Sequence, residues 1–201
     1  MTAKIKLNAA SGGGSFSLQA PSSSSNNRVI TLPDIADGTL LTSQSSISGT
    51  ITMADQWRLH TSYTANGAAA LLANWERVDN TNWSKIGTGM TESSGIFSFP
   101  STGIYYIEFH GRGSASGGAR QYTGIYIQTG VSGTYTNVAD AYDSASANGY
   151  YFDTVTSTYF DVTNTSTHTV RLNVEASAST LYSGNSNQNQ TFVTFIRLGD
   201  T

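Results

Sequence analysis

Cysteine is absent from this sequence, and lysine and proline are scarce. None of the 201 residues is Cys, and only three are Pro and three are Lys. Without cysteine there is no disulfide framework and no thiolate metal site, which fits synthesis in a reducing cytoplasm. Charged residues make up only 11% of the chain and the net charge is −3. This balance excludes the broad basic surface that nucleic acid binding requires.

Long apolar runs are also missing. No stretch approaches the length of a membrane-spanning helix. Lys4 and Lys6 are followed by a Gly-rich run instead of the apolar centre of a signal peptide. We therefore expect no membrane insertion and no ordinary secretion signal.

What the chain does contain favours strands and turns. Aromatic residues reach 11%, with eleven Tyr, and Ser, Thr, Asn and Gly dominate the polar residues. A disordered chain would lack the aromatics, and β-formers separated by turn residues are typical of sheets. The composition therefore predicts an all-β fold.

The central stretch, residues 94–110, is apolar on both sides. Tyr105, Ile107 and Phe109 are two apart and share one face of an extended strand, while Ile104 and Tyr106 occupy the other. Such a strand needs a core on one side and another cover, often a second subunit, on the other.

The spacing in this stretch resembles the signature of C1q/TNF-like domains. Phe97, Gly103, Tyr105, Ile107 and Phe109 read F-x5-G-x-Y-x-I-x-F, with Ile107 where the family has a second Phe. The resemblance extends over about residues 55–201, with further matches at Trp75, Asn80 and the closing stretch 191–200. It implies an antiparallel jelly-roll sandwich that assembles as a homotrimer.

Further segments complete the expected domain, residues 51–201. Strands are expected at 122–128, 154–162, 168–176 and 191–198, about ten in all. Residues 68–75 form a short helix-like run, 66–67 a turn, 111–121 a flexible loop, and 133–143 and 147–152 turn-rich segments.

The preceding region, residues 1–50, is expected to be a β-structured attachment segment with a linker at 43–50. Short strands are expected at 4–10, 15–20 and 28–32. The region also resembles a segment found in virion proteins of tailed bacteriophages, next to trimeric β-structure. The alternative is a generic Ser/Thr-rich linker. The resemblance rests on Leu18, Ala20, Pro21, Thr31, Leu32, Pro33, Gly38, Thr39 and Leu40.

No residue pattern points to catalysis, a cofactor or a metal. The three histidines, His60, His110 and His168, lack metal-ligand spacing. The acidic pairs Glu76/Asp79 and Asp140/Asp143 are typical of short polar side chains in turns. We expect the protein not to be an enzyme.

Two sets of aromatic and basic residues are candidates for binding. Under the C1q/TNF-like resemblance, the trimer axis would be closed by Tyr105, Ile107, Tyr159, Phe192 and Phe195, unless these are ordinary core. Replacing Phe195 with Asp would then give monomeric or aggregated protein. Receptor-facing loops would carry Arg112, Arg120, Tyr122, Tyr142, Tyr150, Tyr151 and Tyr182, unless these tyrosines only cover loops.

The leading hypothesis is a bacteriophage virion protein, made in the host cytoplasm. It would be a trimeric tail fibre or fibre tip that adheres to a host glycan or outer-membrane receptor and joins other virion proteins through residues 1–50. The alternative is a capsid decoration or head-fibre protein, which the short chain favours. A secreted adhesin is a third class.

Overall fold

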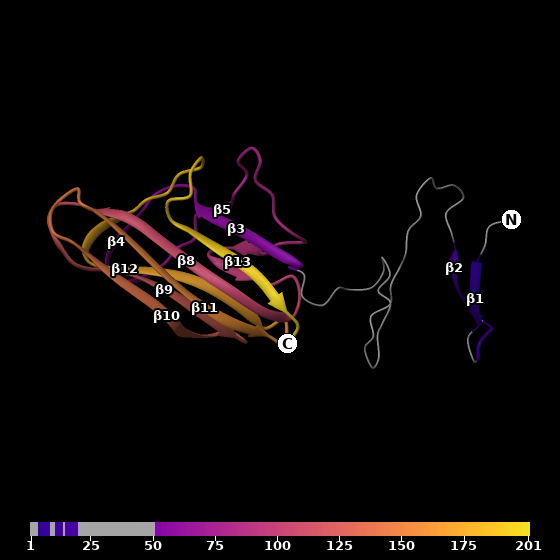
Figure 1. Ribbon diagram of the computed structural model, residues 1–201. Coiled ribbons are helices and arrows are strands. Elements are labelled where there is room, and N and C mark those ends of the chain that lie inside the picture. The colour runs from indigo at the N-terminus through magenta and orange to yellow at the C-terminus, as the bar shows by residue number, and fades with distance from the viewer. Residues whose placement is uncertain (1–3, 9–10, 14, 20–50) are drawn as a thin grey trace, which may run out of the picture. The chain divides into compact units, whose positions relative to one another are not determined.

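The computed structural model describes residues 4–8, 11–13, 15–19 and 51–201 (Figure 1). The chain divides into two compact units, Met1–Ser45 and Ser46–Thr201. In the first, β1 (Lys4–Asn8) pairs antiparallel with β2 (Ser15–Gln19). The expected strand at 28–32, the linker at 43–50 and most of the phage-like segment lie outside the described residues.

The second unit consists of eleven antiparallel strands, and its described residues include no helix, which confirms the all-β prediction. The strands are β3 (Met53–Leu59), β4 (Tyr63–Leu71), β5 (Trp75–Arg77), β6 (Thr91–Ser93), β7 (Ile96–Ser98), β8 (Gly103–Ala115), β9 (Arg120–Val131), β10 (Thr134–Ala145), β11 (Tyr151–Val162), β12 (His168–Tyr182) and β13 (Phe192–Gly199).

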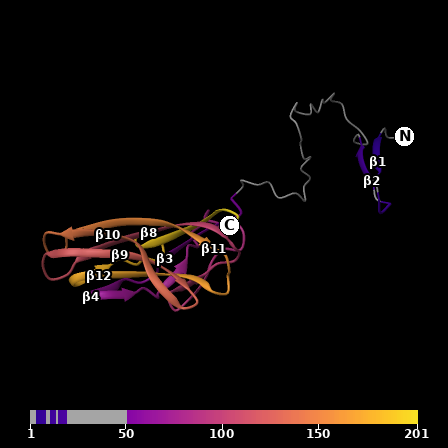
Figure 2. The same cartoon turned by 90° about the horizontal axis from the view of Figure 1, so that it is seen from below.

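The strands fold into two layers, as expected for a jelly roll (Figures 1 and 2). One layer has the order β11–β8–β13–β3–β5. The other contains β10–β9–β12, with β4 and β7 along the far side of β12. The layers join where the end of β12 leaves β9 and pairs with β8, for example Thr180 opposite Ala115.

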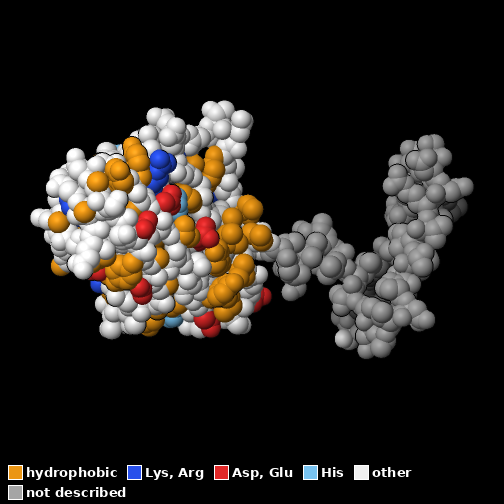
Figure 3. All heavy atoms as spheres, turned by 60° about the vertical axis from the view of Figure 1, so that its left-hand side comes forward, with side chains coloured by type: hydrophobic (Ala, Val, Ile, Leu, Met, Phe, Trp, Pro, Cys, Tyr) orange, Lys and Arg blue, Asp and Glu red, His pale blue; other side chains and the backbone are white. Residues whose placement is uncertain are grey.

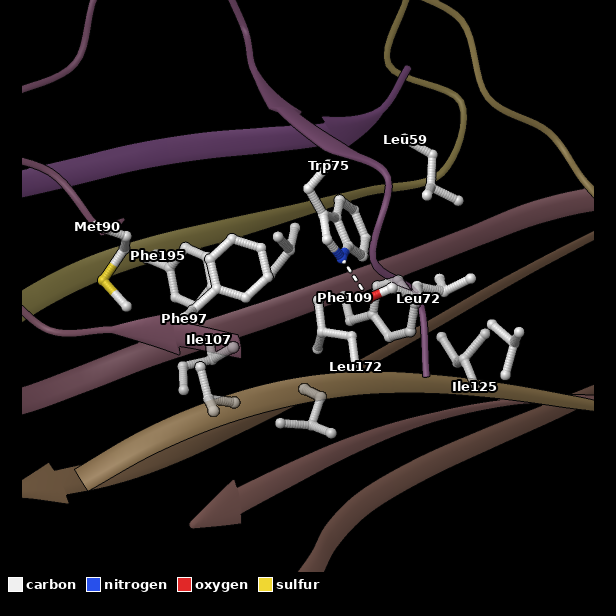
Figure 4. Packing of buried hydrophobic residues seen from close by; sticks show 14 of the residues in the cluster. Leu59, Leu72, Trp75, Met90, Phe97, Ile107, Phe109, Ile125, Leu172 and Phe195 are labelled. Carbon is white, nitrogen blue, oxygen red and sulfur yellow. Dashed lines mark hydrogen bonds between the residues drawn. The ribbon is translucent and has the colours of Figure 1, made fainter. Parts of the chain in front are cut away.

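The core between the layers is rich in aromatic rings (Figure 4). Phe97 lies at its centre, with ring centroids 5.6 Å from Trp57, 5.7 Å from Trp75 and 5.1 Å from Phe195. The indole Nε1 of Trp75 donates to the carbonyl oxygen of Leu72 at 2.9 Å, so this buried polar group is satisfied. The core thus uses Phe97 and Trp75 from the C1q/TNF-like pattern.

The glycine of that pattern is required by the backbone. Gly103 has φ +142°, which L side chains rarely adopt, and a Cβ there would lie 2.5 Å from the carbonyl oxygen of Gly199. Gly103 opens β8 where β13 ends, and its lack of a side chain allows the two strands to meet.

Several expected loops are strands instead. Residues 111–115 continue β8 and residues 120–121 begin β9, so only four residues separate these strands. The segment 133–143 lies mostly in β10, which pairs with β9 along its length. The helix-like run at 68–75 contains no helix, because residues 68–71 belong to β4, where Ala70 and Leu71 pair with β12. The expected turn at 66–67 is an irregularity inside β4. In each case cross-strand pairing outweighs local preference.

Candidate functional site

The inward side of β8 is ordinary core. Tyr105, Ile107 and Phe109 are fully buried, and so is Phe195 of β13. The Tyr105 hydroxyl donates to the carbonyl oxygen of Ser101 at 2.9 Å inside the same chain. The prediction that Tyr105, Ile107 and Phe195 close a subunit interface is therefore wrong, because they already fill the space between the two layers.

The outward side of the same layer carries a second apolar set. We call it the apolar face, and it consists of Ile104, Tyr106, Val155, Tyr159, Phe192 and Ile196. The register places Tyr106 opposite Tyr159 of β11 on one side and Ile196 of β13 on the other. Centroids of the Tyr106 and Tyr159 rings are 5.6 Å apart. Two of the predicted interface residues, Tyr159 and Phe192, lie on this face.

The apolar face is open to solvent at its β11 edge. Tyr159 is 68% exposed and Val155 52% exposed, although both are large β-forming side chains. β11 pairs only with β8, so its other edge has no strand partner among the described residues. Figure 3 shows one side of the protein, where hydrophobic side chains form patches with few Lys or Arg beside them.

Polar groups border the apolar face. The Tyr106 hydroxyl donates to Oε2 of Glu108 at 2.7 Å, and this bond raises the pKa of Tyr106. Farther along β8, His110 pairs with Asp153, and its ring centroid is 4.8 Å from that of Phe192. These contacts hold Tyr106 and Phe192 in fixed orientations on the sheet.

A shallow pocket of about 160 Å³ adjoins the apolar face on its β3 side. Ile196 belongs to both, and Trp83 closes the pocket from the segment that follows β5. The complete lining is Ala54, Asp55, Gln56, Trp83, Ser84, Thr194 and Ile196. The pocket gives this end of the face a concave shape, whereas Tyr159 projects at the other end.

Two of the predicted receptor residues are buried and have structural roles. The guanidinium of Arg120 donates to the carbonyl oxygens of Ser179 at 2.9 Å and Ala119 at 2.8 Å, which ties the β8–β9 turn to β12. Tyr182 is fully buried, and its hydroxyl donates to the carbonyl oxygens of Gly124 and Glu175. Arg120 and Tyr182 therefore cannot face a receptor.

The remaining predicted receptor residues fall into two groups. Tyr150, Tyr151 and Arg112 are exposed near one end of β11, and the Arg112 guanidinium carbon lies 5.6 Å from the ring centroid of Tyr151. Tyr122 and Tyr142 lie together on the other layer, with ring centroids 6.1 Å apart. These two belong to strands β9 and β10, not to loops.

Tyr122 and Tyr142 are part of a larger cluster, the tyrosine platform, which consists of Tyr122, Gly124, Tyr126, Tyr142 and Glu175. The Tyr142 ring lies across Gly124, where a Cβ would be 2.8 Å from the ring. Its hydroxyl is hydrogen bonded to that of Tyr126 and donates to Oε1 of Glu175 at 3.2 Å. Burial, together with Glu175, raises the pKa of Tyr126 far above its ordinary value.

A second pair of a tyrosine ring lying across a glycine, which we call a tyrosine–glycine pair, occurs farther along β9. The Tyr135 ring of β10 lies across Gly130, where a Cβ would be 2.6 Å from the ring. The Tyr135 hydroxyl is 3.0 Å from Oγ1 of Thr169, and the Arg171 guanidinium carbon is 3.9 Å from the ring centroid. Arg171 also donates from Nε to Oε1 of Gln128 at 2.5 Å.

One buried acceptor lies between these two tyrosine–glycine pairs. Asn173 points outward from β12, in register with Tyr126, and is only 8% exposed. Its Oδ1 is the sole buried side-chain polar atom in the described part of the chain without a hydrogen-bond partner. Leaving such an acceptor unpaired costs about 1–3 kcal/mol.

The acidic pairs and histidines show no catalytic arrangement. Glu76 and Asp79 both bind the buried Arg58, each at 2.7 Å, and this pairing explains why they lie close together. Within residues 51–201 and the short N-terminal strands, no group of three or more His, Asp or Glu side chains could hold a metal. The same residues contain no helix long and apolar enough to cross a membrane.

Sequence reasoning missed several residues of both outward faces. Ile104 and Tyr106 stood out as the second face of β8, but only the pairing of β8 with its neighbours tells which face is inward. Gly124 and Glu175 became significant only through their cross-strand position beside Tyr142. The one signal of the tyrosine platform in the sequence is Gly124, which lies two residues from both Tyr122 and Tyr126.

Comparison with solved structures supports the fold. Murine APRIL at pH 5.0 is similar with a TM-score of 0.55 and 14% identity, and the match covers 73% of this chain and 98% of APRIL. Eiger TNF from S. frugiperda gives a TM-score of 0.56 and 12% identity, covering 76% of this chain and 96% of that protein. No family model and no curated protein matches the sequence. The second unit thus has a TNF-like jelly-roll fold.

Proposed function

We propose that this chain forms a homotrimeric, non-enzymatic bacteriophage virion protein that adheres to the surface of a host cell. The second unit supplies the rigid trimeric head, and residues 1–50 attach it to other virion proteins. Three identical heads give an avidity well above that of one weak contact. The protein is made in the host cytoplasm and acts as part of the virion.

The observation that carries self-assembly is the exposed apolar face. A soluble domain rarely leaves rings such as Tyr159 and Tyr106 side by side on a sheet face unless something covers them. The C1q/TNF-like resemblance implies that a second copy does so. Tyr159 projects at one end of the face and the Trp83 pocket lies at the other, so the two ends differ. Such ends can pair in a twofold dimer or in a head-to-tail ring, and the C1q/TNF-like resemblance favours the ring of three.

Support for a virion role comes from the first 50 residues. Their resemblance to phage tail-fibre segments, from Leu18 to Leu40, is the sequence feature that favours this role. Among the residues of the first unit that the structure describes, β1 and β2 form a two-stranded hairpin, which buries little surface by itself and so suits attachment to another protein.

Within the virion, a fibre tip is the first choice and a capsid decoration protein the second. A trimeric decoration protein would occupy a threefold capsid position, whereas a fibre tip would expose its head to the cell.

Gold-labelled antibody against this protein, applied to intact particles of the phage that encodes it, tests the proposal in the electron microscope. Label at the tail is expected. Label spread regularly over the head would favour the decoration role, and particles without label would overturn the virion assignment. Light scattering of the purified chain tests the trimer separately, and a monomer at micromolar concentration would contradict it.

A further inference from the structure

The outward face of β10–β9–β12 has a different character from the apolar face. Its aromatic residues are all tyrosines, and Tyr126, Tyr135 and Tyr142 each use the hydroxyl in a hydrogen bond. Charged and amide side chains are interspersed among the rings. A second copy of the chain would bury these polar groups without matching them, so this face suits a hydroxyl-rich ligand better.

We propose that this face, the tyrosine platform together with Tyr135 and Arg171, is the site that binds host-surface glycan. This inference rests on the proposed adhesion function and names the surface that performs it. The ligand is an extended, uncharged polysaccharide whose rings stack on the tyrosines.

The Tyr142–Gly124 pair provides the stacking surface, whereas the Arg171 guanidinium covers the Tyr135 ring. Because Gly124 and Gly130 have no side chains, Tyr142 and Tyr135 lie close against the sheet instead of standing upright. Tyr142 remains 51% exposed, so its ring is accessible to a ligand. A sugar ring presents an apolar C–H side that packs on such a surface, as apolar groups do in other shallow ligand sites.

The spacing of the pairs indicates an extended ligand. Gly124 and Gly130 are six residues apart in one strand, which corresponds to about 20 Å. This is longer than one sugar ring, so a chain of several rings would be needed to reach from Tyr142 to the Arg171 side chain over Tyr135.

Polar groups between the pairs match sugar hydroxyls. The amides of Gln128 and Asn137 and the ions of Arg171 and Glu175 offer both donors and acceptors. Asn173, which is more than nine-tenths buried, contributes an Oδ1 that no protein group satisfies. A ligand hydroxyl that induces a small rotation of this amide would provide the missing donor.

The charges on this face disfavour an acidic polymer. Asp140 lies opposite Tyr126 and Glu175 opposite Gly124 in the strand register, and Arg171 is already engaged with Gln128 and the Tyr135 ring. A phosphate- or carboxylate-rich polymer would be repelled by the two carboxylates, whereas a neutral one would not.

Binding of the full-length protein to purified neutral polysaccharide from the host surface, measured by calorimetry, is the direct test. Tyr142→Ala is expected to weaken binding by about tenfold or more, since such a ring is typical of energetic hot spots. Tyr151→Ala is the matched control, because it removes an even more exposed tyrosine (72%) away from the platform, and its affinity should stay unchanged. Tyr142→Phe keeps the ring if the alanine variant folds poorly, and it should lose less.

A parallel assay on cells separates this inference from the proposed function. This protein, labelled with a fluorescent dye, should bind host cells. Periodate treatment of the cells, which destroys sugar rings, should abolish the binding. Binding that survives periodate but is lost after protease treatment points to a protein receptor and overturns the glycan site while adhesion stands. Equal loss in the two alanine variants, or no binding to the purified polysaccharide, also overturns it. Absence of label on virions would refute the proposed function alone.

Discussion

The two outward faces of this sandwich are built from the same kind of strand but carry opposite chemistry. On the apolar face, the apolar surfaces of Tyr159 and Val155 are exposed to solvent. The platform holds Tyr126 and Tyr142 in a network that ends on Glu175. Apolar exposure is stabilised only by a matching apolar surface, whereas a satisfied polar network can remain open to water. A jelly roll can therefore assign assembly to one layer and ligand binding to the other.

The largest effect is expected from a substitution in the core, because both outward faces require a folded sandwich. Phe195→Asp places a charge in the fully buried core and should abolish folding, because the cost exceeds several kcal/mol and domains of this size are stable by about 5–15 kcal/mol. Circular dichroism would show no cooperative thermal transition. Ser146→Asp, in the exposed turn between β10 and β11 and away from the apolar face, is the control and should melt close to the wild type. A folded Phe195→Asp variant would place Phe195 outside the core.

The second prediction compares the same kind of substitution on each of the two faces. Tyr159→Asp should convert the proposed trimer to a folded monomer by placing a charge in the proposed subunit contact, with an affinity loss of about 2 kcal/mol or more per contact. Tyr142→Asp, on the other layer, should remain trimeric. Size-exclusion chromatography with light scattering distinguishes the two. If Tyr142→Asp dissociates and Tyr159→Asp does not, the roles of the faces are reversed.

Alkaline pH tests the contribution of the tyrosine platform to stability, which the apolar face does not share. Burial raises the pKa of Tyr126 well above its ordinary value of 10.0, so in the folded protein this phenol keeps its proton. The stability it contributes is fully present below pH 10 and decreases as the pH rises above that value. Denaturant unfolding at pH 9 and pH 11 should show this decrease. Tyr126→Phe should make the decrease smaller, and an unchanged slope would contradict the assignment.

The smallest effect concerns the contact between Tyr142 and Gly124. Gly124→Ala puts a methyl group 2.8 Å from the Tyr142 ring, and the exposed ring can lift to accommodate it. We expect a stability change within about 1 kcal/mol, because relief of the glycine entropy cost offsets the lost contact. A double-mutant cycle with Tyr142→Ala should give a coupling energy of about 0.5 kcal/mol or more. Strict additivity would show that the ring does not pack on Gly124.

The sequence was sufficient to predict the fold class and insufficient to orient the faces. The F-x5-G-x-Y-x-I-x-F spacing located the central strand and its glycine, and the alternation in β12 correctly placed Val170, Leu172 and Val174 inside. In β8, however, both faces are apolar, so periodicity alone cannot tell Tyr105 from Tyr106. Only the register with β11 and β13 decides it, and that register depends on residues far away in the sequence.

The predicted placement of the receptor-facing residues was partly wrong for a related reason. Tyr122 and Tyr142 were found by their residue type, and the structure brings them together although twenty residues separate them. Arg120 was misplaced because the Gly- and Ser-rich segment 111–121 is typical of a loop, whereas its ends belong to β8 and β9. Tyr182 was misplaced for another reason, because it ends strand β12 and is fully buried there. Side-chain type indicates what a residue can bind, but pairing decides whether it is accessible.

The position of β13 has a consequence for synthesis of the protein. It is the last strand of its layer in the chain, yet it lies between β8 and β3 and carries Phe192 and Ile196 of the apolar face. At a translation rate of about 5–20 residues per second, β8 waits several seconds on the ribosome before this neighbour emerges. During that interval the apolar face is incomplete, so neighbouring nascent chains on one messenger RNA lack the surface needed to associate prematurely. For the trimer proposed above, strand order would thus delay oligomerisation until each subunit can fold.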